Sequence, residues 1–490
     1  MNWRVPILPA LQGNEPMITS LLLAGTLMAS QPANASRPNI VYIMADDLGY
    51  TDPACYGSKY YETPNIDRLA SQGMRFLEGY SCGPNCQPTR AALMSGQYGA
   101  RTGVYTVGSI DRFDWQSRPL KPVENVQQLP KGKVTIADAL KSAGYSTALF
   151  GKWHLGQQGD FLPNHRGFDE SIVSMGKHFN FETTPDTRHP KDIYLADFLT
   201  NKAVDYIKRH KEKPFFLCVN HFGVHSPYEA KPELVQKFKN KPGVGGHKNP
   251  VYAAMLYSVD ESVGRILKTL DEQGLSRNTL VIFTSDNGGV GGYGREKIKA
   301  ESQDATDNAP LRGGKGMLYE GGIRVPYIFR MPGTIPEGTT SSHRINSVDL
   351  YPTLLELSGS KAPGNYKLDG VSYLPALQQK TIADRVDMFW HFPGYLGAGP
   401  NTYRTTPVSV IRSGNWKLLE FLEDGKLELY DISQDIGEKN DLSKTNTEKT
   451  SELAQKLRVW RTGINAPMPT KNTPKPSQPG LTKKKKKAGN

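Results

Sequence analysis

The segment of residues 86–96, which reads CQPTRAALMSG, combines a reactive side chain with the start of a predicted helix. Pro88 suits the first turn of a helix, where a missing amide proton costs no hydrogen bond, so we expect Cys86 just outside the helix N-terminus. Free backbone amides and the helix dipole favour a thiolate, or an anion such as sulfate or phosphate, at that position. Arg90 adds a positive charge one turn into the helix. Taken alone, such a cysteine is more often a buried small side chain or half of a disulfide.

Two pairs of oxygen-bearing side chains lie at the ends of predicted strands that are far apart in the chain. Asp46 and Asp47 directly follow residues 39–45 (NIVYIMA), and Asp286 and Asn287 lie at the end of a second apolar run (TLVIFT). An all-oxygen set of this kind suits a hard cation, calcium or magnesium, whereas zinc prefers imidazole and thiolate ligands. Each pair by itself is also typical of a turn or a helix cap. Their common position at strand ends favours a metal site.

Three further side chains that can handle charge or protons follow two other predicted strands. Lys152 and His154 belong to GKWH, directly after residues 146–150, and His225 lies in HSPY, beyond the buried run PFFLCVN. A lysine can neutralise an anionic oxygen, and a histidine can move a proton near neutral pH. His221 is available by the same chemistry.

Lys315 lies in a glycine-rich segment, LRGGKGMLYEGGIRVP, at residues 311–326. Its glycines let the backbone bend closely around a ligand. The segment is not a Walker phosphate loop, because GxxxxGKS or GxxxxGKT is absent and no suitable strand precedes it.

Short apolar runs alternate with helical patterns over the first three quarters of the chain. The predicted strands are residues 39–45, 74–80, 146–150, 214–220 and 279–284, and the predicted helices are residues 63–72, 134–143, 192–210 and 251–273. Such alternation predicts an α/β fold, in which helices flank a large, mostly parallel central sheet. Ligands of these sheets bind beyond the carboxyl ends of the strands, so we expect four strand ends to meet at one site.

After about residue 385 the pattern changes to short strands separated by turns. Residues 408–411, 416–421 and 427–430 predict a small antiparallel sheet, and residues 447–461 predict a closing helix. The domains expected are therefore a catalytic domain at residues 36–385 and a C-terminal subdomain at residues 386–465. A chain of 490 residues is long enough for two such units.

The two ends of the chain differ from the body in composition. Residues 466–490 contain seven lysines and no acidic residue, so this Pro/Lys-rich tail is expected to be disordered and accounts for much of the net charge of +12. The mildly basic remainder suits an anionic substrate, and nothing in the pattern favours a nucleic acid. An apolar stretch at residues 18–29 is followed by Ala33, Asn34 and Ala35, which predicts a signal peptide at residues 1–35.

No later segment has the length of a membrane span, so we expect an exported protein, periplasmic or secreted, without a transmembrane segment. Four cysteines follow the predicted signal peptide: Cys55, Cys82, Cys86 and Cys218. In an oxidising compartment Cys55 and Cys82 are candidates for a disulfide, but the sequence leaves the connectivity open.

CQPTR followed by ALMSG, together with GKWHLG, resembles the signatures of the type I sulfatases, which are formylglycine-dependent members of the alkaline-phosphatase superfamily. The resemblance runs from about residue 38 to residue 461. It implies an alkaline-phosphatase-like fold and a maturation enzyme that oxidises Cys86 to formylglycine (3-oxoalanine), whose hydrated aldehyde is the nucleophile. It also implies one divalent cation, calcium in most members, held by Asp46, Asp47, Asp286, Asn287 and the modified residue 86.

The same resemblance implies roles for the remaining candidates. Arg90, Lys152 and Lys315 balance charge on the sulfuryl oxygens. His225, together with Lys315, protonates the leaving oxygen, and the family pattern of a histidine two residues before a proline selects it over His221. His154 takes the proton from the second hydroxyl of the hydrated aldehyde, which releases sulfate.

The substrates implied are sulfated polysaccharides or glycosaminoglycan-type fragments, with galactose or N-acetylgalactosamine sulfates as the first choice. His178, with Arg188 nearby, and His391 in FWHFPGY are the residues we expect to recognise the sugar. One alternative is a phosphodiesterase or phosphonate monoester hydrolase of the same superfamily. Another is a non-catalytic relative that binds sulfated glycans, but such a protein would tolerate loss of Cys86, Lys152 or Asp286, and all three are present.

Overall fold

The structure, a computed structural model, describes residues 37–298, 304–380, 387–399 and 402–475. The predicted signal peptide and the run of five lysines near the end of the chain lie outside the described residues.

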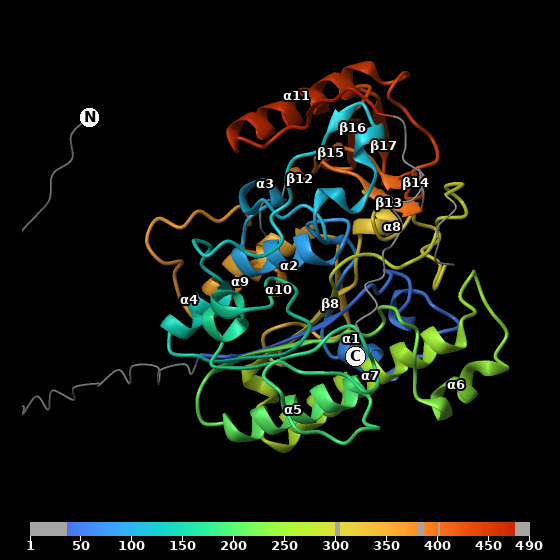
Figure 1. The fold of residues 1–490 in the computed structure, drawn as a ribbon. Helices are drawn as coiled ribbons and strands as arrows, with labels where there is room; N and C mark the ends of the chain where they lie inside the picture. The colour runs from blue at the N-terminus through green and yellow to red at the C-terminus, as the bar shows by residue number, and fades with distance from the viewer. Residues whose placement is uncertain (1–36, 299–303, 381–386, 400–401, 476–490) are drawn as a thin grey trace, which may run out of the picture. The chain divides into compact units, whose positions relative to one another are not determined.

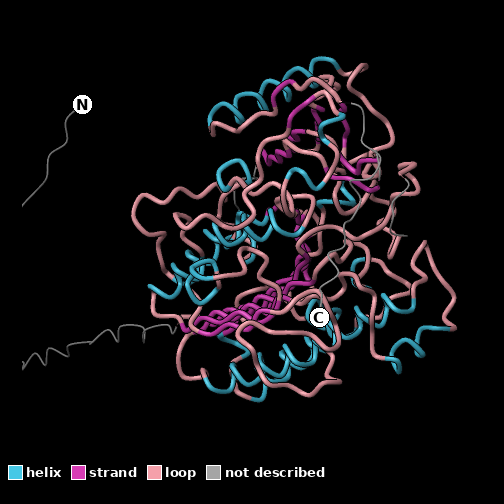
Figure 2. Tube along the Cα trace, in the orientation of Figure 1, coloured by secondary structure: helices cyan, strands magenta, loops and turns pink. Residues whose placement is uncertain are grey.

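An eight-stranded sheet runs through the centre of the described chain (Figures 1 and 2). Strand β1 is central and pairs in parallel with β7 and β8, and β9 runs antiparallel to both of its neighbours. The order across the sheet is β10 (Thr339–Ser341), β2 (Met74–Phe76), β9 (Tyr327–Arg330), β8 (Thr279–Ser285), β1 (Asn39–Ala45), β7 (Phe215–Asn220), β5 (Ser146–Gly151) and β6 (Glu170–Val173). The predicted large and mostly parallel sheet is therefore confirmed.

Helices cover both faces of this sheet, and β1 shows the consequence for its sequence. Val41 and Ile43 pack into the core on one face, and Ile40 and Tyr42 pack into the core on the other. Because both faces are buried, the strand is apolar throughout and does not alternate with polar residues.

The two helical layers lie on opposite sides of the sheet in Figure 1. One layer contains α1 (Pro64–Ser71), α5 (Leu195–Arg209), α6 (Pro232–Lys239) and α7 (Pro250–Glu272). The other contains α2 (Cys86–Ser95), α4 (Ile136–Ser142), α9 (Leu350–Ser358) and α10 (Leu374–Leu377).

The strand predicted at residues 74–80 is divided in the structure. Its first part is β2, and its second part, β3 (Gly79–Tyr80), pairs instead with β11 (Ile345–Asn346). The carbonyl oxygen of Leu77 between them accepts hydrogen bonds from Arg324 Nη2 at 2.6 Å and from the Tyr50 hydroxyl at 3.0 Å. These side chains replace a neighbouring strand as partners, so the ladder is interrupted there.

Helix α4 is shorter than the predicted residues 134–143, because Thr135 is its N-cap. The Thr135 hydroxyl accepts from the Asp138 amide at 3.0 Å, and the Asp138 carboxylate accepts from the Thr135 amide at 2.8 Å. This reciprocal capping box fixes where the helix begins.

The C-terminal part forms the predicted antiparallel sheet and closing helix, seen at the top of Figure 1. Its strand order is β12 (Asp387–Phe392), β15 (Val408–Ser413), β16 (Trp416–Phe421) and β17 (Leu427–Asp431). Helix α11 (Thr447–Gly463) buries Leu453 and Leu457 against one face of this sheet. The other face packs Trp390 and Leu419 against Leu318, which lies in the glycine-rich segment three residues after Lys315.

Small elements connect these parts. A short hairpin is formed by β13 (Leu396–Gly399) and β14 (Thr402–Thr405), and two short helices are α3 (Gly99–Thr102) and α8 (Glu320–Ile323). The expected start of the disordered tail at residue 466 is wrong, since β18 (Thr470–Lys471) pairs with β4 (Leu120–Lys121). No helix in the described ranges is long and apolar enough to cross a bilayer.

Candidate active site

Helix α2 carries Cys86 as its first residue, with Asn85 as the N-cap, whereas the sequence predicts Cys86 just outside the helix. The Cys86 side chain is 2% exposed. Burial raises the pKa of the Cys86 thiol, although nearby Lys152 and Lys315 lower it. The expected stabilisation of a thiolate by the helix N-terminus is therefore outweighed by desolvation. Within the described residues, which include all four cysteines, the candidate disulfide between Cys55 and Cys82 is not formed.

Arg90, one turn along α2, joins the helix to the ends of two strands. Its Nε and Nη2 donate to Oδ2 of Asp286 at 3.0 and 2.8 Å. Its Nη1 donates to the carbonyl oxygen of Lys152 at 2.8 Å. A guanidinium held at three donor positions has one orientation, so Arg90 fixes α2 against the carboxyl ends of β8 and β5.

Asp46 and Asp47 directly follow β1, and each binds one lysine. Lys152 Nζ lies 2.5 Å from Oδ2 of Asp46, and Lys315 Nζ lies 2.6 Å from Oδ2 of Asp47. Burial raises the pKa of Asp47, but Lys315 and His225 outweigh it and hold that pKa well below its usual range. The carboxylates of Asp46 and Asp47 are therefore each paired with the ammonium group of one lysine.

The oxygens at this site suit a divalent cation. Oδ1 of Asp46 and Oδ1 of Asn287 are buried, and neither accepts a hydrogen bond from the described residues. Burial and the nearby Asp46 carboxylate raise the pKa of Asp286 to about 6, although Arg90 and Lys152 lower it. Uncompensated carboxylates and orphan amide oxygens are the donors that a hard cation such as calcium prefers.

The geometry brings the predicted metal ligands close together. One ligand atom from each of Asp46, Asp47, Cys86 and His225 lies within 4.8 Å of the others. Asn287 joins the group through its Nδ2, which donates to Oδ1 of Asp47 at 2.9 Å. His225 was not predicted as a ligand, and its contact with this set is through Oδ2 of Asp47, 3.7 Å from Nε2.

The two histidines predicted to move protons lie beside these charges. His154 has a φ of 63° and a buried Nδ1 that has no hydrogen-bond partner in the described chain. Burial, followed by the charges of Lys152 and Arg90, lowers the pKa of His154 well below its usual value. Nδ1 of His225 donates to the Ser226 carbonyl oxygen at 2.6 Å, which leaves Nε2 as the acceptor in the neutral ring. Burial also lowers the pKa of His225, to about 4.

The loop that carries Lys315 is held by its backbone. The Lys315 amide donates to the Gly289 carbonyl at 3.0 Å, and the Tyr293 hydroxyl donates to the Lys315 carbonyl at 2.7 Å. A Cβ on Gly288 would lie 1.9 Å from the carbonyl oxygen of Gly321. Only glycine permits this close approach, which holds the lysine loop against the end of β8.

His178 does not lie where a sugar can reach it. The side chain is buried, stacks on Tyr194 and Phe222, and donates through Nε2 to the carbonyl oxygen of His225 at 2.8 Å. The expected role in sugar recognition is therefore wrong for this ring. Its contacts support the segment that carries His225. Arg188 is exposed.

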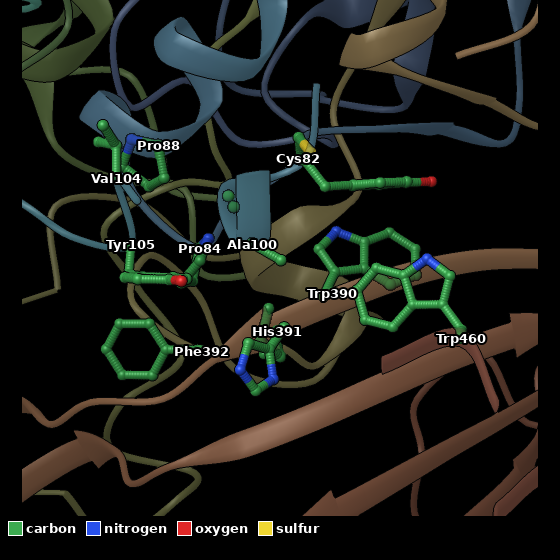
Figure 3. A pocket seen from close by; sticks show the side chains of 14 residues that line it. Cys82, Pro84, Pro88, Ala100, Val104, Tyr105, Trp390, His391, Phe392 and Trp460 are labelled. Carbon is green, nitrogen blue, oxygen red and sulfur yellow. The ribbon is translucent and has the colours of Figure 1, made fainter. Parts of the chain in front are cut away.

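His391 lines a small cavity together with Pro84, Pro88 and Trp390, and no member of the charged cluster lines that cavity (Figure 3). The cavity measures about 10 Å³, which is room for one water molecule at most. Both His391 nitrogens are engaged, Nδ1 with the Ser409 hydroxyl at 2.8 Å and Nε2 with the Pro467 carbonyl at 2.7 Å. With no free nitrogen, His391 is unsuited to the sugar contact predicted for it.

Sequence reasoning missed a polar layer under Asp47. The Tyr252 hydroxyl donates to Oδ2 of Asp52 at 2.5 Å, and His247 Nε2 lies 3.4 Å from Oδ1 of the same carboxylate. The Gly49 amide also donates to Asp52 at 2.8 Å, which folds the chain after Asp47. Asp52 follows Asp47 closely in sequence, so the sequence could have suggested it. Its partners Tyr252, in α7, and His247, just before α7, lie far along the chain and could not be predicted from a local pattern.

The comparisons with known proteins agree with this site. The chain matches the sulfatase family model over residues 38–360, and a model described as N-sulphoglucosamine sulphohydrolase, C-terminal, over residues 314–462. It is 35% identical to a sulfatase of Formosa agariphila, over 92% of this chain and 94% of that protein. It is 33% identical to the N-acetylgalactosamine-6-sulfatase of Rattus norvegicus, over 77% of this chain and 72% of that protein. The solved structure of Ps i-CgsB matches with a TM-score of 0.72 at 30% identity, over 87% of this chain and 93% of that one.

A mostly parallel sheet therefore brings a cysteine, two lysines and a set of buried oxygens together at one edge. The chain belongs to the sulfatase family. It is accordingly a sulfuric ester hydrolase, and the predicted family and enzyme class are confirmed.

Proposed function

We propose that this protein removes sulfate from sulfated carbohydrates, with galactose or N-acetylgalactosamine sulfates as the preferred class. The observation that carries the proposal is the buried cluster in which Lys152 and Lys315 flank Cys86 and the carboxylates of Asp46 and Asp47. The names of the relatives support the substrate class, since one is an N-acetylgalactosamine-6-sulfatase and Ps i-CgsB has been solved in complex with k-i-k-neocarrahexaose.

The proposal includes two groups that the sulfatase family implies. Asp46, Asp47, Asp286 and Asn287, with residue 86, would hold a calcium ion, which polarises sulfate oxygens as a Lewis acid when bound. Cys86, once matured to formylglycine, would supply a hydrated aldehyde as the nucleophile. The unpartnered buried oxygens of Asp46 and Asn287 fit the first group, and the position of Cys86 beside them fits the second.

The lysines act on the charge of the sulfate ester. The ammonium groups of Lys152 and Lys315 lie on the carboxylates of Asp46 and Asp47. If those carboxylates held a divalent cation, the two lysines would be free to donate to the sulfate oxygens. Donors fixed in a desolvated site stabilise developing negative charge without reorganisation, which is the largest single contribution in many enzymes. Arg90 keeps its place on Asp286, and its contribution is to orient the nucleophile helix.

The histidines act on protons. The side chain of His225 is 26% exposed and its Nε2 faces the charged cluster, so it can reach the oxygen of the leaving alcohol. The negative charge of a bound sulfate ester raises the pKa of such an imidazole, which favours the protonated form needed for a general acid. His154, with its unpartnered Nδ1 among cations, stays neutral and serves as the base near residue 86.

Export and maturation belong to the same proposal. We infer that residues 1–35 direct the chain out of the cytoplasm as a signal peptide, to the periplasm or the medium. A maturation enzyme would convert Cys86 to formylglycine. The conversion matters because the unmodified cysteine, with 2% exposure and a raised pKa, is a poor nucleophile.

The test measures sulfate release from a panel of defined mono- and oligosaccharide sulfates, with phosphate and phosphonate esters alongside. The protein carries a residue 86 whose conversion has been confirmed by peptide mass. Cys86→Ala is the inactive variant, and Cys55→Ala, outside the site, is the matched control. Sulfate release that is lost only in Cys86→Ala supports the proposal. Turnover of phosphate or phosphonate esters in place of sulfate esters would contradict it, and so would binding of sulfated sugars without turnover.

A further inference from the structure

Two arginines near the cluster have no acidic partner among the described residues. Arg404, on β14, and Arg112, at the end of the short 3-10 turn Ile110–Arg112, form no ion pair there. Arg404 is half buried and Arg112 is exposed, whereas several half-buried arginines elsewhere in the described chain are paired, as Arg312 with Glu296 and Arg118 with Glu423 show. An arginine without a carboxylate partner near an anion-binding cluster is a candidate binding group for a further anion.

Arg404 lies directly beside the loop that carries Lys315. A Cβ on Gly316 would lie 2.9 Å from Cδ of Arg404, so the arginine side chain runs along this glycine. The Arg404 guanidinium carbon lies 4.5 Å from the centre of the Tyr293 ring, whose hydroxyl donates to the Lys315 carbonyl. Lys315 in turn reaches Asp47. Tyr293 therefore lies between Arg404 and Lys315, which belongs to the charged cluster.

The Arg404 side chain is half buried and incompletely satisfied. Its Nε is buried and has no hydrogen-bond acceptor in the described part of the chain. Burying a guanidinium donor without an acceptor is unfavourable, and an anion with two or more oxygens removes that penalty by binding the planar fork.

Arg112 is brought to the same place by packing between its turn and the hairpin of β13 and β14. A Cβ on Gly397 would lie 2.5 Å from Cδ1 of Phe113, and the Tyr403 hydroxyl donates to the Asp114 carbonyl at 2.6 Å. The turn that carries Arg112 therefore packs against the hairpin that carries Arg404. The Arg112 side chain is exposed, and its Nη1 donates to the Val107 carbonyl at 3.3 Å, so the rest of its guanidinium is open to an anion.

We propose that Arg112 and Arg404 form a second anion subsite, which binds a negatively charged group of the substrate other than the sulfate that is cleaved. This inference rests on the proposed sulfatase activity and specifies its substrate class, sulfated sugars that carry a second sulfate or a neighbouring carboxylate. Because the subsite touches the Lys315 loop through Gly316, an occupied subsite also holds that loop against the reacting ester. Both arginines are specificity-determining residues, and neither touches the sulfur that reacts.

The test compares three substrates with the matured enzyme: N-acetylgalactosamine 6-sulfate, its 4,6-disulfate, and the 6-sulfate linked to a uronic acid. The readout is kcat/KM for each doubly charged substrate divided by kcat/KM for the monosulfate. A charge-assisted hydrogen bond that is lost is expected to lower this ratio about tenfold in Arg404→Gln or Arg112→Gln. The disulfate and the uronate distinguish a sulfate from a carboxylate as the second group.

Arg458→Gln, an exposed arginine of α11, removes the same charge and is the matched control, with an unchanged ratio. If both subsite variants keep the wild-type ratio for both doubly charged substrates, the inference is overturned. If the wild type releases no sulfate, calorimetric titration of the Cys86→Ala protein with the 4,6-disulfate measures binding at the subsite independently of turnover. Weaker binding in Cys86→Ala/Arg404→Gln then supports the subsite, and equal binding overturns it.

Discussion

Lys315 shows how one side chain serves both the fold and the proposed chemistry. Its Nζ lies 2.6 Å from Asp47, its amide bonds to Gly289 and its carbonyl accepts from Tyr293. Burial lowers the pKa of Lys315, but the Asp47 carboxylate outweighs this and holds it well above its usual value, so the ammonium stays charged. A permanently charged donor at a fixed point is what an oxyanion requires.

Replacing this donor is therefore expected to slow the reaction. Lys315→Met should lower kcat for sulfate release by about 100-fold, because one fixed donor to a developing anion is lost. Lys268→Met, an exposed lysine of α7, is the control and should match the wild type. Steady-state kinetics with a chromogenic sulfate ester checks this, and a variant with kcat within about twofold of the wild type would remove Lys315 from the chemistry.

The oxygens of Asp46 and Asn287 lead to a prediction about calcium. Treatment with a chelator should abolish sulfate release and lower the melting temperature, and calcium should restore both, because a ligand that binds only the folded state adds RT ln(1 + [L]/Kd) to its stability. Differential scanning calorimetry with and without 1 mM calcium, about 100 times an assumed Kd of 10 μM, should report a gain of about 2.7 kcal/mol. Asp46→Asn should reduce that shift. A melting temperature indifferent to calcium in the wild type would contradict the site.

Among the elements, strand β16 and helix α8 are joined by a buried charge cluster. Lys417 Nζ lies 3.0 Å from Oε1 of Glu320 and 2.8 Å from Oε1 of Glu438, and all three side chains are fully buried. Oε2 of Glu438 accepts from the Glu320 amide at 2.7 Å. This cluster fixes the chain just after the Lys315 loop onto the C-terminal sheet. Sequence reasoning did not find it, because its members lie in three distant segments.

One lysine cannot neutralise two glutamates equally. The unequal ionisation of Glu320 and Glu438 should therefore appear in the pH dependence of the free energy of unfolding. Burial raises the pKa of Glu438 to about 7, whereas for Glu320 the effect of burial is outweighed by Lys417 and Arg324, which lower its pKa to about 2. The unfolded chain ionises Glu438 near 4.5, so the folded state loses stability as pH rises from about 4.5 to 7. Glu320 has the opposite effect on the pH dependence of stability. Its ionised form stabilises the folded state above about pH 4.5, and this stabilisation is lost as pH falls from about 4.5 towards 2.

Glu438→Gln should therefore remove a loss of stability on the order of 2 kcal/mol between pH 5 and pH 7.5. Urea denaturation at the two pH values measures it, and the relevant quantity is the difference between them, since the introduced amide has its own pH-independent hydrogen-bond cost. Glu452→Gln, on the exposed part of α11, is the control and should keep the wild-type difference. The same pH difference in Glu438→Gln and the wild type would show that Glu438 is ionised throughout.

At the scale of the whole molecule, the C-terminal sheet and the α/β domain share one apolar layer. Trp390, Leu419 and Val410 of the sheet pack with Leu318 and Ile323, on either side of Glu320. The Trp390 indole also donates to the Ser81 carbonyl at 2.8 Å, five residues before Cys86. The two parts should unfold together, because neither buries these surfaces alone.

We expect a single cooperative transition. Tryptophan fluorescence, far-ultraviolet circular dichroism and residual sulfatase activity should give the same midpoint in urea. Trp390→Phe should lower all three midpoints together. A separate early transition that leaves activity intact would show that the C-terminal sheet folds independently.

The sequence predicted the parts of this molecule that depend on local pattern. Strand β1 was predicted at its observed residues, and Asp46, Lys152 and Asp286 were expected together because parallel strands end at one edge of a sheet. What failed depended on contacts between distant segments. His178 and His391 were expected to recognise the sugar, but His178 Nε2 donates to the His225 carbonyl, and both His391 nitrogens are engaged by Ser409 and Pro467. The division of the strand at Leu77 follows from Arg324, which no local pattern reveals.

The central place of β1 also determines when this chain can fold. Strand β1 ends at Ala45, and its register partner in β8 is Ser285, 240 residues later. At a synthesis rate of about 5 to 20 residues per second, roughly 12 to 50 seconds pass before the ribosome has made that partner. Strand β1 has no partner until β7 has been made, and its edge towards β8 stays unpaired through the rest of this interval, during which it is open to association with other chains. We expect folding of this protein to begin late in synthesis or after it, and its yield to depend on what shields the first strand until then.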